Sequence, residues 1–382
     1  MKINNISLKK IFIWSPMISH VGTIKASIGI ANSFNKIKQK TKIIIYLLNI
    51  FGEFDHIPNS ENVRKLNIFN KMIFFKTGIL SKVCIHVFSI LSLPFLIFYV
   101  FKHKPNVIIT CLVGYLPSLL KFFFTELKII NSIQGYPKIN KLRKILWKST
   151  YKKSDSLVTM SNLTKNYLIE QLSISEKKLY KIDNPIITRN IRLLSNQKLD
   201  EEDKFIFKKK VFCSIGRLTR QKNYLELLEG FANFSKNNKD EYNLIIIGEG
   251  EQRKMLEDYI SRNQLKNCFL IGFKSNPYKY LSKSSLYISS SLWEEPGHTL
   301  IEAGYLNIPI LTSNCPNGPK EIFQHKVNGF VYELENPKDL EIKLLSLKYV
   351  SQEEMFKIKL CMKKIVSNYT EFKFAKKMQY LI

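Results

Sequence analysis

Short apolar runs alternate with amphipathic stretches along most of the chain. In the first half, runs at 11–15, 41–49, 106–111, 128–133, 157–160 and 179–182 predict strands, while 24–37, 115–124 and 162–171 predict helices. In the second half, runs at 210–215, 243–247, 268–271, 286–289, 307–312 and 329–332 predict strands, with helices at 224–234, 251–260 and 277–281. Strands that alternate with helices in this way predict two α/β domains with parallel sheets.

Two stretches of the first half depart from this pattern. Residues 51–82 have no clear period, and we consider a strand near 72–75. Residues 83–101 contain no formally charged side chain if His86 is neutral, which by length alone would allow a membrane span. Because Pro94 and His86 lie inside the run, we expect a helix that contacts a membrane surface. A buried core helix and a true span are the alternatives.

Length and charge narrow the class of protein. The 382 residues are 45% hydrophobic, which suffices for two domain cores. The net charge is +28, and residues 1–185 hold 28 Lys+Arg against 8 Asp+Glu, or +20. This excess favours an anionic partner, either an acidic membrane surface or nucleic acid, although compositional drift would also raise the lysine content. Six scattered cysteines and the absence of a signal-peptide pattern predict a cytosolic protein.

Candidate chemistry is concentrated at residues 289–330. The strand at 286–289 leads through Pro296 and Gly297 into a helix, and the N–H groups of such a helix start stabilise an anion. Glu294 precedes this helix and Glu302 lies within it; carboxylates of this kind hydrogen-bond well to sugar hydroxyls. The combination indicates a nucleotide sugar, and two surface acids beside a helix start are the alternative.

A second candidate loop, 216–223, follows the strand at 210–215. In this loop Arg217 offers a bidentate fork and Lys222 a point charge, the two common partners of phosphate. Fixed cations can stabilise the charge that develops on a diphosphate leaving group in place of a metal ion. Since no Asp-x-Asp motif is present, we expect neither a metal nor a cofactor besides the donor itself. The acidic residues 200–203 are interpreted as part of a solvated linker.

The Glu294-x7-Glu302 spacing, the segment Cys-Pro-Asn-Gly-Pro-Lys-Glu-Ile at 315–322 and the loop at 216–223 resemble retaining glycosyltransferases of family 4. The resemblance is strong over 211–330 and moderate over 106–185. It implies the GT-B fold, in which two Rossmann-like domains face across a cleft. The implied parts are an acceptor domain at 1–185, a linker at 186–208, a nucleotide-sugar domain at 209–365, and a C-terminal segment at 366–382 whose helix crosses back to the first domain.

The resemblance also implies roles for individual residues. Arg217 and Lys222 would hold the donor phosphates and Glu294 would contact the transferred sugar, and these three are the expected catalytic residues. Glu302 would bind the ribose hydroxyls. The other residues expected on the donor side are Gly216, Gly272, Phe273, Gly297, His298 and Thr299. Phe273 could equally be a core residue, and His298 a structural one.

On the acceptor side the sequence departs from the family pattern. Gly22 is the only glycine left in the first loop, where relatives usually have several, and Gln134 stands where many relatives have a histidine. Because glutamine cannot act as a base, a turn-stabilising amide is an equal interpretation of Gln134.

The activity implied is transfer of a sugar from a nucleoside diphosphate, expected to be UDP, with retention of configuration. The enzyme would be a hexosyl- or N-acetylhexosaminyltransferase. A polyprenyl-diphosphate-linked glycan of O-antigen or capsule synthesis is the expected acceptor, with the protein peripheral on the inner face of the plasma membrane. The alternatives are a GT-B glycan phosphorylase, for which no pyridoxal-lysine motif is found, and a basic nucleic-acid-binding protein, for which no recognition motif is found.

Overall fold

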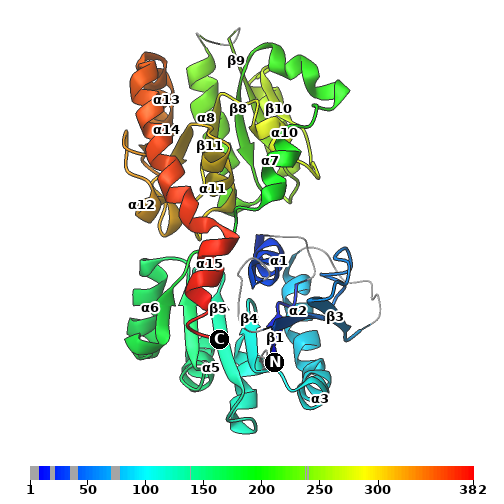
Figure 1. Cartoon of the computed structure of the whole chain (residues 1–382). Helices are drawn as coiled ribbons and strands as arrows, with labels where there is room; N and C mark the ends of the chain where they lie inside the picture. The colour runs from blue at the N-terminus through cyan, green and yellow to red at the C-terminus, as the bar shows by residue number, and fades with distance from the viewer. Residues whose placement is uncertain are drawn as a thin grey trace, which may run out of the picture. The chain divides into compact units, whose positions relative to one another are not determined.

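The computed structural model describes residues 8–17, 22–34, 42–69, 78–137, 139–236, 238 and 241–382. The chain divides into two compact units. Unit 1 comprises Met1–Ile186 and Thr370–Ile382, and unit 2 comprises Ile187–Tyr369. Each unit contains a parallel sheet with helices packed on it (Figure 1). The predicted α/β class with two Rossmann-like domains is therefore confirmed.

The described residues of unit 1 form a seven-stranded sheet of order β3-β2-β1-β4-β5-β6-β7. The strands are β1 (Leu8–Trp14), β2 (Lys42–Asn49), β3 (Val63–Asn67), β4 (Val107–Thr110), β5 (Lys128–Ile133), β6 (Ser156–Thr159) and β7 (Leu179–Lys181). From β1 the strand order runs to one side and from β4 to the other. The point between β1 and β4 is therefore a topological switch point, where the loops after the two strands lead in opposite directions. Sheets of this kind bind ligands at such a point.

Helices cover both faces of this sheet. They are α1 (Gly22–Phe34), α2 (Gly78–Leu91), α3 (Leu93–His103), α4 (Tyr115–Ser118), η1 (Leu119–Phe122), α5 (Lys141–Tyr151), α6 (Asn162–Leu172) and η2 (Glu176–Lys178). Alternate side chains of β1 point to opposite faces: Ile11 and Ile13 join the core beneath α1, and Phe12 and Trp14 join the core beneath α3. Burial on both faces explains why residues 11–14 of this strand are continuously apolar.

The structure of unit 1 differs from the sequence predictions between residues 51 and 103. β3 was not predicted, because it is a mixed Val-Arg-Lys-Leu-Asn sequence that pairs with β2 at the sheet edge. The strand considered at 72–75 falls outside the described residues. The run at 83–101 forms parts of two helices, with Pro94 in the first turn of α3. Among the described residues no single helix is long and apolar enough to span a bilayer, and α2 and α3 would do so only as a pair bent by 46°.

The described residues of unit 2 form a six-stranded sheet of order β10-β9-β8-β11-β12-β13. The strands are β8 (Lys210–Ile215), β9 (Tyr242–Ile247), β10 (Cys268–Leu270), β11 (Leu286–Ser289), β12 (Ile310–Ser313) and β13 (Phe330–Tyr332). The helices are α7 (Arg189–Ser195), η3 (Glu201–Lys208), η4 (Arg220–Lys222), α8 (Tyr224–Ser235), α9 (Arg253–Arg262), α10 (Tyr278–Leu281), α11 (His298–Tyr305), α12 (Gly318–Ile322), α13 (Pro337–Ser346), η5 (Leu347–Tyr349), α14 (Gln352–Val366) and η6 (Ser367–Tyr369). Here the switch point lies between β8 and β11.

Of residues 186–208, predicted as a linker, all but Ile186 belong to unit 2, where they form α7 and η3. Asp203 is buried, and its Oδ2 accepts a hydrogen bond from the Tyr280 hydroxyl at 2.7 Å and lies 2.7 Å from Lys274 Nζ. The interpretation of this acidic segment as solvated was wrong for Asp203, whose partners lie more than 70 residues further along the chain, whereas Glu201 and Glu202 are exposed.

The chain ends on unit 1 with α15 (Glu371–Met378). This helix packs against α1, where the rings of Phe374 and Phe34 meet edge to face at 6.4 Å. Lys377 Nζ also lies 3.2 Å from Asp183 Oδ2, after the last strand of the unit 1 sheet. The predicted return of the C-terminal helix to the first domain is confirmed.

Candidate active site

The turns that follow β8, β9 and β10 form a connected row at the carboxyl edge of the unit 2 sheet. The N–H of Gly216 donates to Ile247 O at 3.0 Å, and that of Gly248 donates to Gly272 O at 2.8 Å. Gly248 has a φ of 151°, and a Cβ there would lie 1.9 Å from Gly216 O. Only glycine fits so close an approach. Gly216 and Gly272, two of the predicted donor-side residues, thus lie in joined turns.

Lys222 and Glu294 meet beside this row. Glu294 Oε1 forms an ion pair with Lys222 Nζ and accepts a hydrogen bond from Ser291 Oγ at 2.6 Å. The side chain of Lys222 is 18% exposed and that of Glu294 is 9% exposed, so water screens the ion pair weakly. A carboxylate and an ammonium group are thereby held together where the loops after β8 and β11 converge.

Backbone and side-chain hydrogen bonds fix these two loops against each other. Gln221 Nε2 donates to Trp293 O at 2.9 Å, and the N–H of Leu292 donates to Gln221 O at 2.8 Å. Ser290 Oγ donates to Lys222 O at 2.8 Å. Lys222 is therefore positioned by its backbone as well as by its charge.

Helix α11 begins directly after this pair. Gly297, its N-cap residue, has a φ of 92°, and the helix runs from His298 with its positive dipole end toward the loop. Within the helix Glu302 is 3% exposed, and its Oε1 accepts a hydrogen bond from the Tyr278 hydroxyl at 2.8 Å. Burial and the adjacent carboxylate raise the pKa of Tyr278, which therefore stays protonated as a donor. The Tyr287 hydroxyl donates a hydrogen bond to Thr299 Oγ1 at 2.5 Å.

Two further donor-side residues are exposed. Arg217 lies in the turn after β8 with an exposed side chain. Phe273 follows the turn after β10 and is 71% exposed, so the alternative that it is a core residue is wrong. An exposed cation and an exposed ring suit contact with a ligand, and the roles of both residues stay predictions.

The two residues predicted on the acceptor side lie in unit 1. Gly22 begins α1, and the residues immediately before it are outside the described part of the chain. The amides of Gln134 and Asn184 bond to each other, with Asn184 Nδ2 donating to Gln134 Oε1 at 2.7 Å. Gln134 Nε2 also donates to Ser132 Oγ at 2.7 Å. These contacts match the turn-stabilising interpretation of Gln134, and a role toward an acceptor stays a prediction.

Sequence reasoning missed Asn317. It is 1% exposed, forms a backbone bridge with Glu294, and has a φ of 73°. Neither side-chain amide atom has a hydrogen-bond partner among the described residues. A buried amide without partners costs free energy, so polar groups of this kind often mark a site. The Asn-Gly-Pro sequence at 317–319 signals the turn, but the burial beside Glu294 depends on the fold.

Three acidic residues lie close enough to share a metal ion: one directly before η3 and two within it. Asp200, Glu202 and Asp203 have carboxylate oxygens within 4.8 Å of one another. Lys274 Nζ approaches all three, at 3.5, 3.2 and 2.7 Å respectively. Lys279 also forms an ion pair with Asp200, so two lysines offset most of the charge of the three acids and hold η3 in place within unit 2.

Comparison with known proteins shows a family resemblance over part of the chain. Residues 196–355 match the model of the family described as "Glycosyl transferases group 1". Over these residues the chain is similar to the group 1 glycosyl transferases. The matched region contains all of the donor-side residues predicted from the sequence, and the predicted relationship to bacterial glycosyltransferases is confirmed.

Two curated relatives illustrate the extent of the similarity. An uncharacterized glycosyltransferase of Methanocaldococcus jannaschii is 32% identical over 202 residues, which are 52% of this chain and 50% of the relative. The N-acetylgalactosamine-N,N'-diacetylbacillosaminyl-diphospho-undecaprenol 4-alpha-N-acetylgalactosaminyltransferase of Campylobacter jejuni is 26% identical over 251 residues, 63% of this chain and 64% of the relative. The chain thus spans half to two thirds of the length of these relatives.

A solved structure supports the fold over nearly the whole chain. The crystal structure of Anabaena HepE in complex with UDP superimposes with a TM-score of 0.74 at 14% identity and covers 97% of this chain and 98% of HepE. At this level of identity the likeness concerns the fold, and it confirms the predicted GT-B class.

Proposed function

We propose that this protein is a retaining glycosyltransferase that moves a sugar from a UDP-sugar to an acceptor hydroxyl. The observation that carries the proposal is the Lys222–Glu294 pair at the start of α11, with Glu302 buried in the same helix. The relatives named as glycosyltransferases and the UDP in the HepE crystal support it.

Donor binding would exchange the partners of this ion pair. The donor diphosphate brings negative charge to Lys222 and to the N-terminus of α11, and can displace Glu294 from the ammonium group. Glu294 is then available to accept a hydrogen bond from the sugar, while Glu302 accepts from the ribose hydroxyls. Arg217 adds a bidentate contact from its exposed turn. The proposal invokes neither a metal nor a further cofactor.

The same cations would assist bond cleavage. As the bond between the sugar anomeric carbon and the β-phosphate oxygen breaks, Arg217 and Lys222 stabilise the charge left on UDP. The acceptor oxygen forms its bond to the anomeric carbon on the same face, and the departing diphosphate takes the acceptor proton. Configuration is thereby retained without a protein base.

The proposed acceptor is a polyprenyl-diphosphate-linked glycan of cell-surface polysaccharide synthesis, such as O-antigen or capsule. The name of the Campylobacter relative includes a diphospho-undecaprenol acceptor. Residues 1–185 of this chain carry 28 Lys+Arg against 8 Asp+Glu, a charge that suits a diphosphate lipid and the cytoplasmic membrane surface. The transferred group would be a hexosyl or N-acetylhexosaminyl unit.

The test uses the purified full chain, a panel of radiolabelled UDP-sugars and a membrane lipid extract. Label should pass into the lipid fraction with one of the donors. Arg217→Ala and Glu302→Gln should each weaken UDP affinity about 10- to 100-fold, as expected for loss of a charge-assisted hydrogen bond. Arg262→Ala, which removes an exposed arginine at the end of α9, is the matched control.

Two results would overturn the proposal. One is that no label reaches lipid or any soluble glycan with any donor in the panel. The other is that the variants bind UDP as tightly as the wild-type chain does. Formation of a sugar 1-phosphate from glycan and inorganic phosphate would instead identify a phosphorylase.

A further inference from the structure

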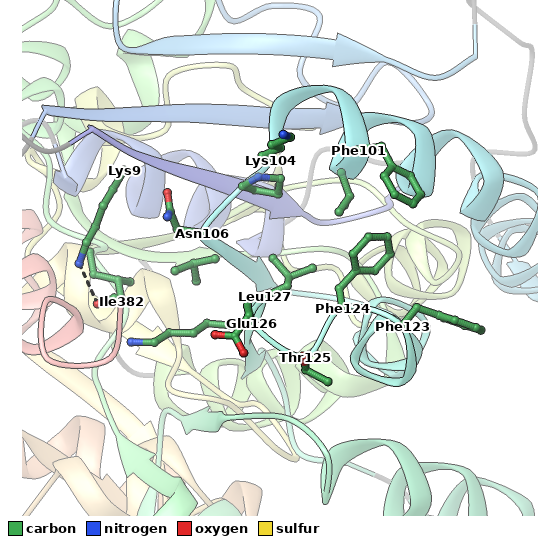
Figure 2. Close-up of a pocket in the computed structure, with 14 residues that line it drawn as sticks. Lys9, Phe101, Lys104, Asn106, Phe123, Phe124, Thr125, Glu126, Leu127 and Ile382 are labelled. Carbon is green, nitrogen blue, oxygen red and sulfur yellow. Dashed lines mark hydrogen bonds between the residues drawn. The ribbon is translucent and has the colours of Figure 1, made fainter.

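A cavity of about 600 Å³ opens in unit 1 at the amino ends of β1, β4 and β5 (Figure 2). Lys9 of β1, Val107 of β4 and Lys128 of β5 are among its lining residues. The switch-point loops follow the opposite, carboxyl ends of the strands, where a doubly wound sheet binds its substrates. The cavity therefore needs an explanation other than the sugar acceptor.

The walls of the cavity divide into an apolar and a basic part. Figure 2 shows Phe101, Phe123 and Phe124 gathered on one side, and the rings of Phe101 and Phe124 meet edge to face at 5.0 Å. The rest of the wall has neutral residues together with three lysines and one acid, Glu126; the lysines are Lys9, Lys104 and Lys128. Lys9 Nζ donates to Ile382 O at 3.2 Å. Among the described residues neither Lys104 nor Lys128 forms an ion pair. An anionic amphiphile fits such a division.

The apolar wall continues as an exposed surface outside the cavity. On α3 the residues spaced three apart, Phe95, Phe98 and Phe101, are exposed, whereas Leu96 and Val100 enter the core. Phe122 and Phe123 extend this surface from the end of η1, and Phe123 is 79% exposed. So large an exposed apolar surface indicates a contact with a partner.

Lysines accompany these exposed rings. Lys102 Nζ lies 5.7 Å from the centroid of Phe98, and Lys153 Nζ lies 3.4 Å from the centroid of Phe122. Residues 82–153 as a whole contain twelve Lys or Arg and one acid, Glu126. Rings beside long basic side chains are typical of surfaces at the boundary between water and an anionic membrane.

We propose that the cavity binds an anionic phospholipid of a membrane surface. Lys104 and Lys128 contact the headgroup phosphate, and the three phenylalanines of the wall contact the upper part of the acyl chains. Aliphatic side chains of α2 that are also exposed favour lipid over nucleic acid, since they offer nothing on which a base can stack: Val83, Val87, Ile90 and Leu91. The inference rests on the proposed function for its membrane setting, and it specifies which face of unit 1 meets the lipid.

The experiment measures flotation of the full chain with vesicles. The wild-type chain should bind vesicles of equal parts phosphatidylglycerol and phosphatidylcholine, and should not bind pure phosphatidylcholine. Lys104→Ala/Lys128→Ala should lower the partition coefficient about thirtyfold, since each lysine near an anionic surface contributes about fivefold. Phe101→Ala/Phe123→Ala should lower it at least about tenfold.

Matched controls come from α14 of unit 2. Phe356→Ala removes a phenylalanine as exposed as Phe101, at 67% against 64%, and Lys363→Ala/Lys364→Ala removes two exposed lysines. Both should bind vesicles within about twofold of the wild-type chain. Equal losses in the control and cavity variants would overturn the proposal, because they would show attraction by net charge alone.

A nucleic-acid partner would give another result. If the lysine pair matters but the phenylalanine pair does not, and a single-stranded oligonucleotide displaces the vesicles, the surface binds polyanions in general and the proposal is wrong. The UDP-induced rise in melting temperature is measured on the same variants and should not change. Its absence in the wild-type chain would count against the proposed function, independently of the vesicle result.

Discussion

At the scale of single residues, burial can change the charge that a side chain carries. Glu53 follows β2 and is 4% exposed. Its Oε2 accepts from the backbone N–H groups of Ile50 and Phe51 at 3.0 and 2.6 Å, and its Oε1 has no hydrogen-bond partner among the described residues. Burial, with a smaller contribution from Asp55, raises the pKa of Glu53 from 4.5 to about 8. This carboxyl group is therefore protonated at neutral pH in the folded protein.

This pKa predicts a stability that falls as pH rises. Between pH 4.5 and about 8 the folded chain binds the proton of Glu53 and the unfolded chain does not. Stability is thus lost with rising pH in this window, at up to about 1.4 kcal/mol per pH unit. Glu53→Gln should remove that part of the slope and stabilise the protein at pH 8. Urea unfolding at pH 5, 6.5 and 8 checks this, and an unchanged slope would contradict it.

At the scale of elements, α15 shows how a distant segment completes a core. Its residues Phe374, Ala375 and Met378 are buried in unit 1, although the preceding 183 residues, 187–369, belong to unit 2. The helix has its own N-cap, since the Thr370 side chain accepts from the N–H of Lys373. Its amphipathic pattern explains why it is a helix. Its place against α1 follows from the shape of the unit 1 core.

Phe374→Ala should therefore destabilise unit 1 by about 3 to 5 kcal/mol, through lost burial and the cavity left behind. Phe372→Ala on the same helix is the control, since Phe372 is 56% exposed and should change stability by less than about 0.5 kcal/mol. The change in the free energy of unfolding is measured by urea denaturation, with hydrogen exchange of the β1 and α1 amides as the probe of unit 1. Equal effects of the two substitutions would show that α15 does not complete the core.

At the scale of the whole molecule, the two units should respond to different ligands. We expect UDP to slow amide hydrogen exchange in residues 216–223 and 290–302 of unit 2. Anionic vesicles should slow it in residues 93–128 of unit 1, because the exposed rings and lysines lie there. Mass-spectrometric exchange with each ligand separately tests the assignment. Protection of unit 1 alone by UDP would contradict the donor site.

The sequence by itself determined the features that depend on neighbours along the chain. The apolar runs fixed most strands, and turn residues around Gly216, Gly272 and Gly297 marked the loops that carry the candidate site. The run at 83–101 indicated helix, since periodicity and the absence of charge are local properties. Arg217, Lys222, Glu294 and Glu302 were recognised by their spacing, and their individual roles stay predictions.

The tertiary structure decided what depends on partners far apart in sequence. The Lys222–Glu294 pair joins residues 72 positions apart, and it exists because β8 and β11 are adjacent strands. Burial of Asp203 against Tyr280 and exposure of Phe273 were not predictable for the same reason. Local patterns set which segments become helix or strand. Strand order and packing set which side chains meet and which face solvent, because burial is a property of the folded chain.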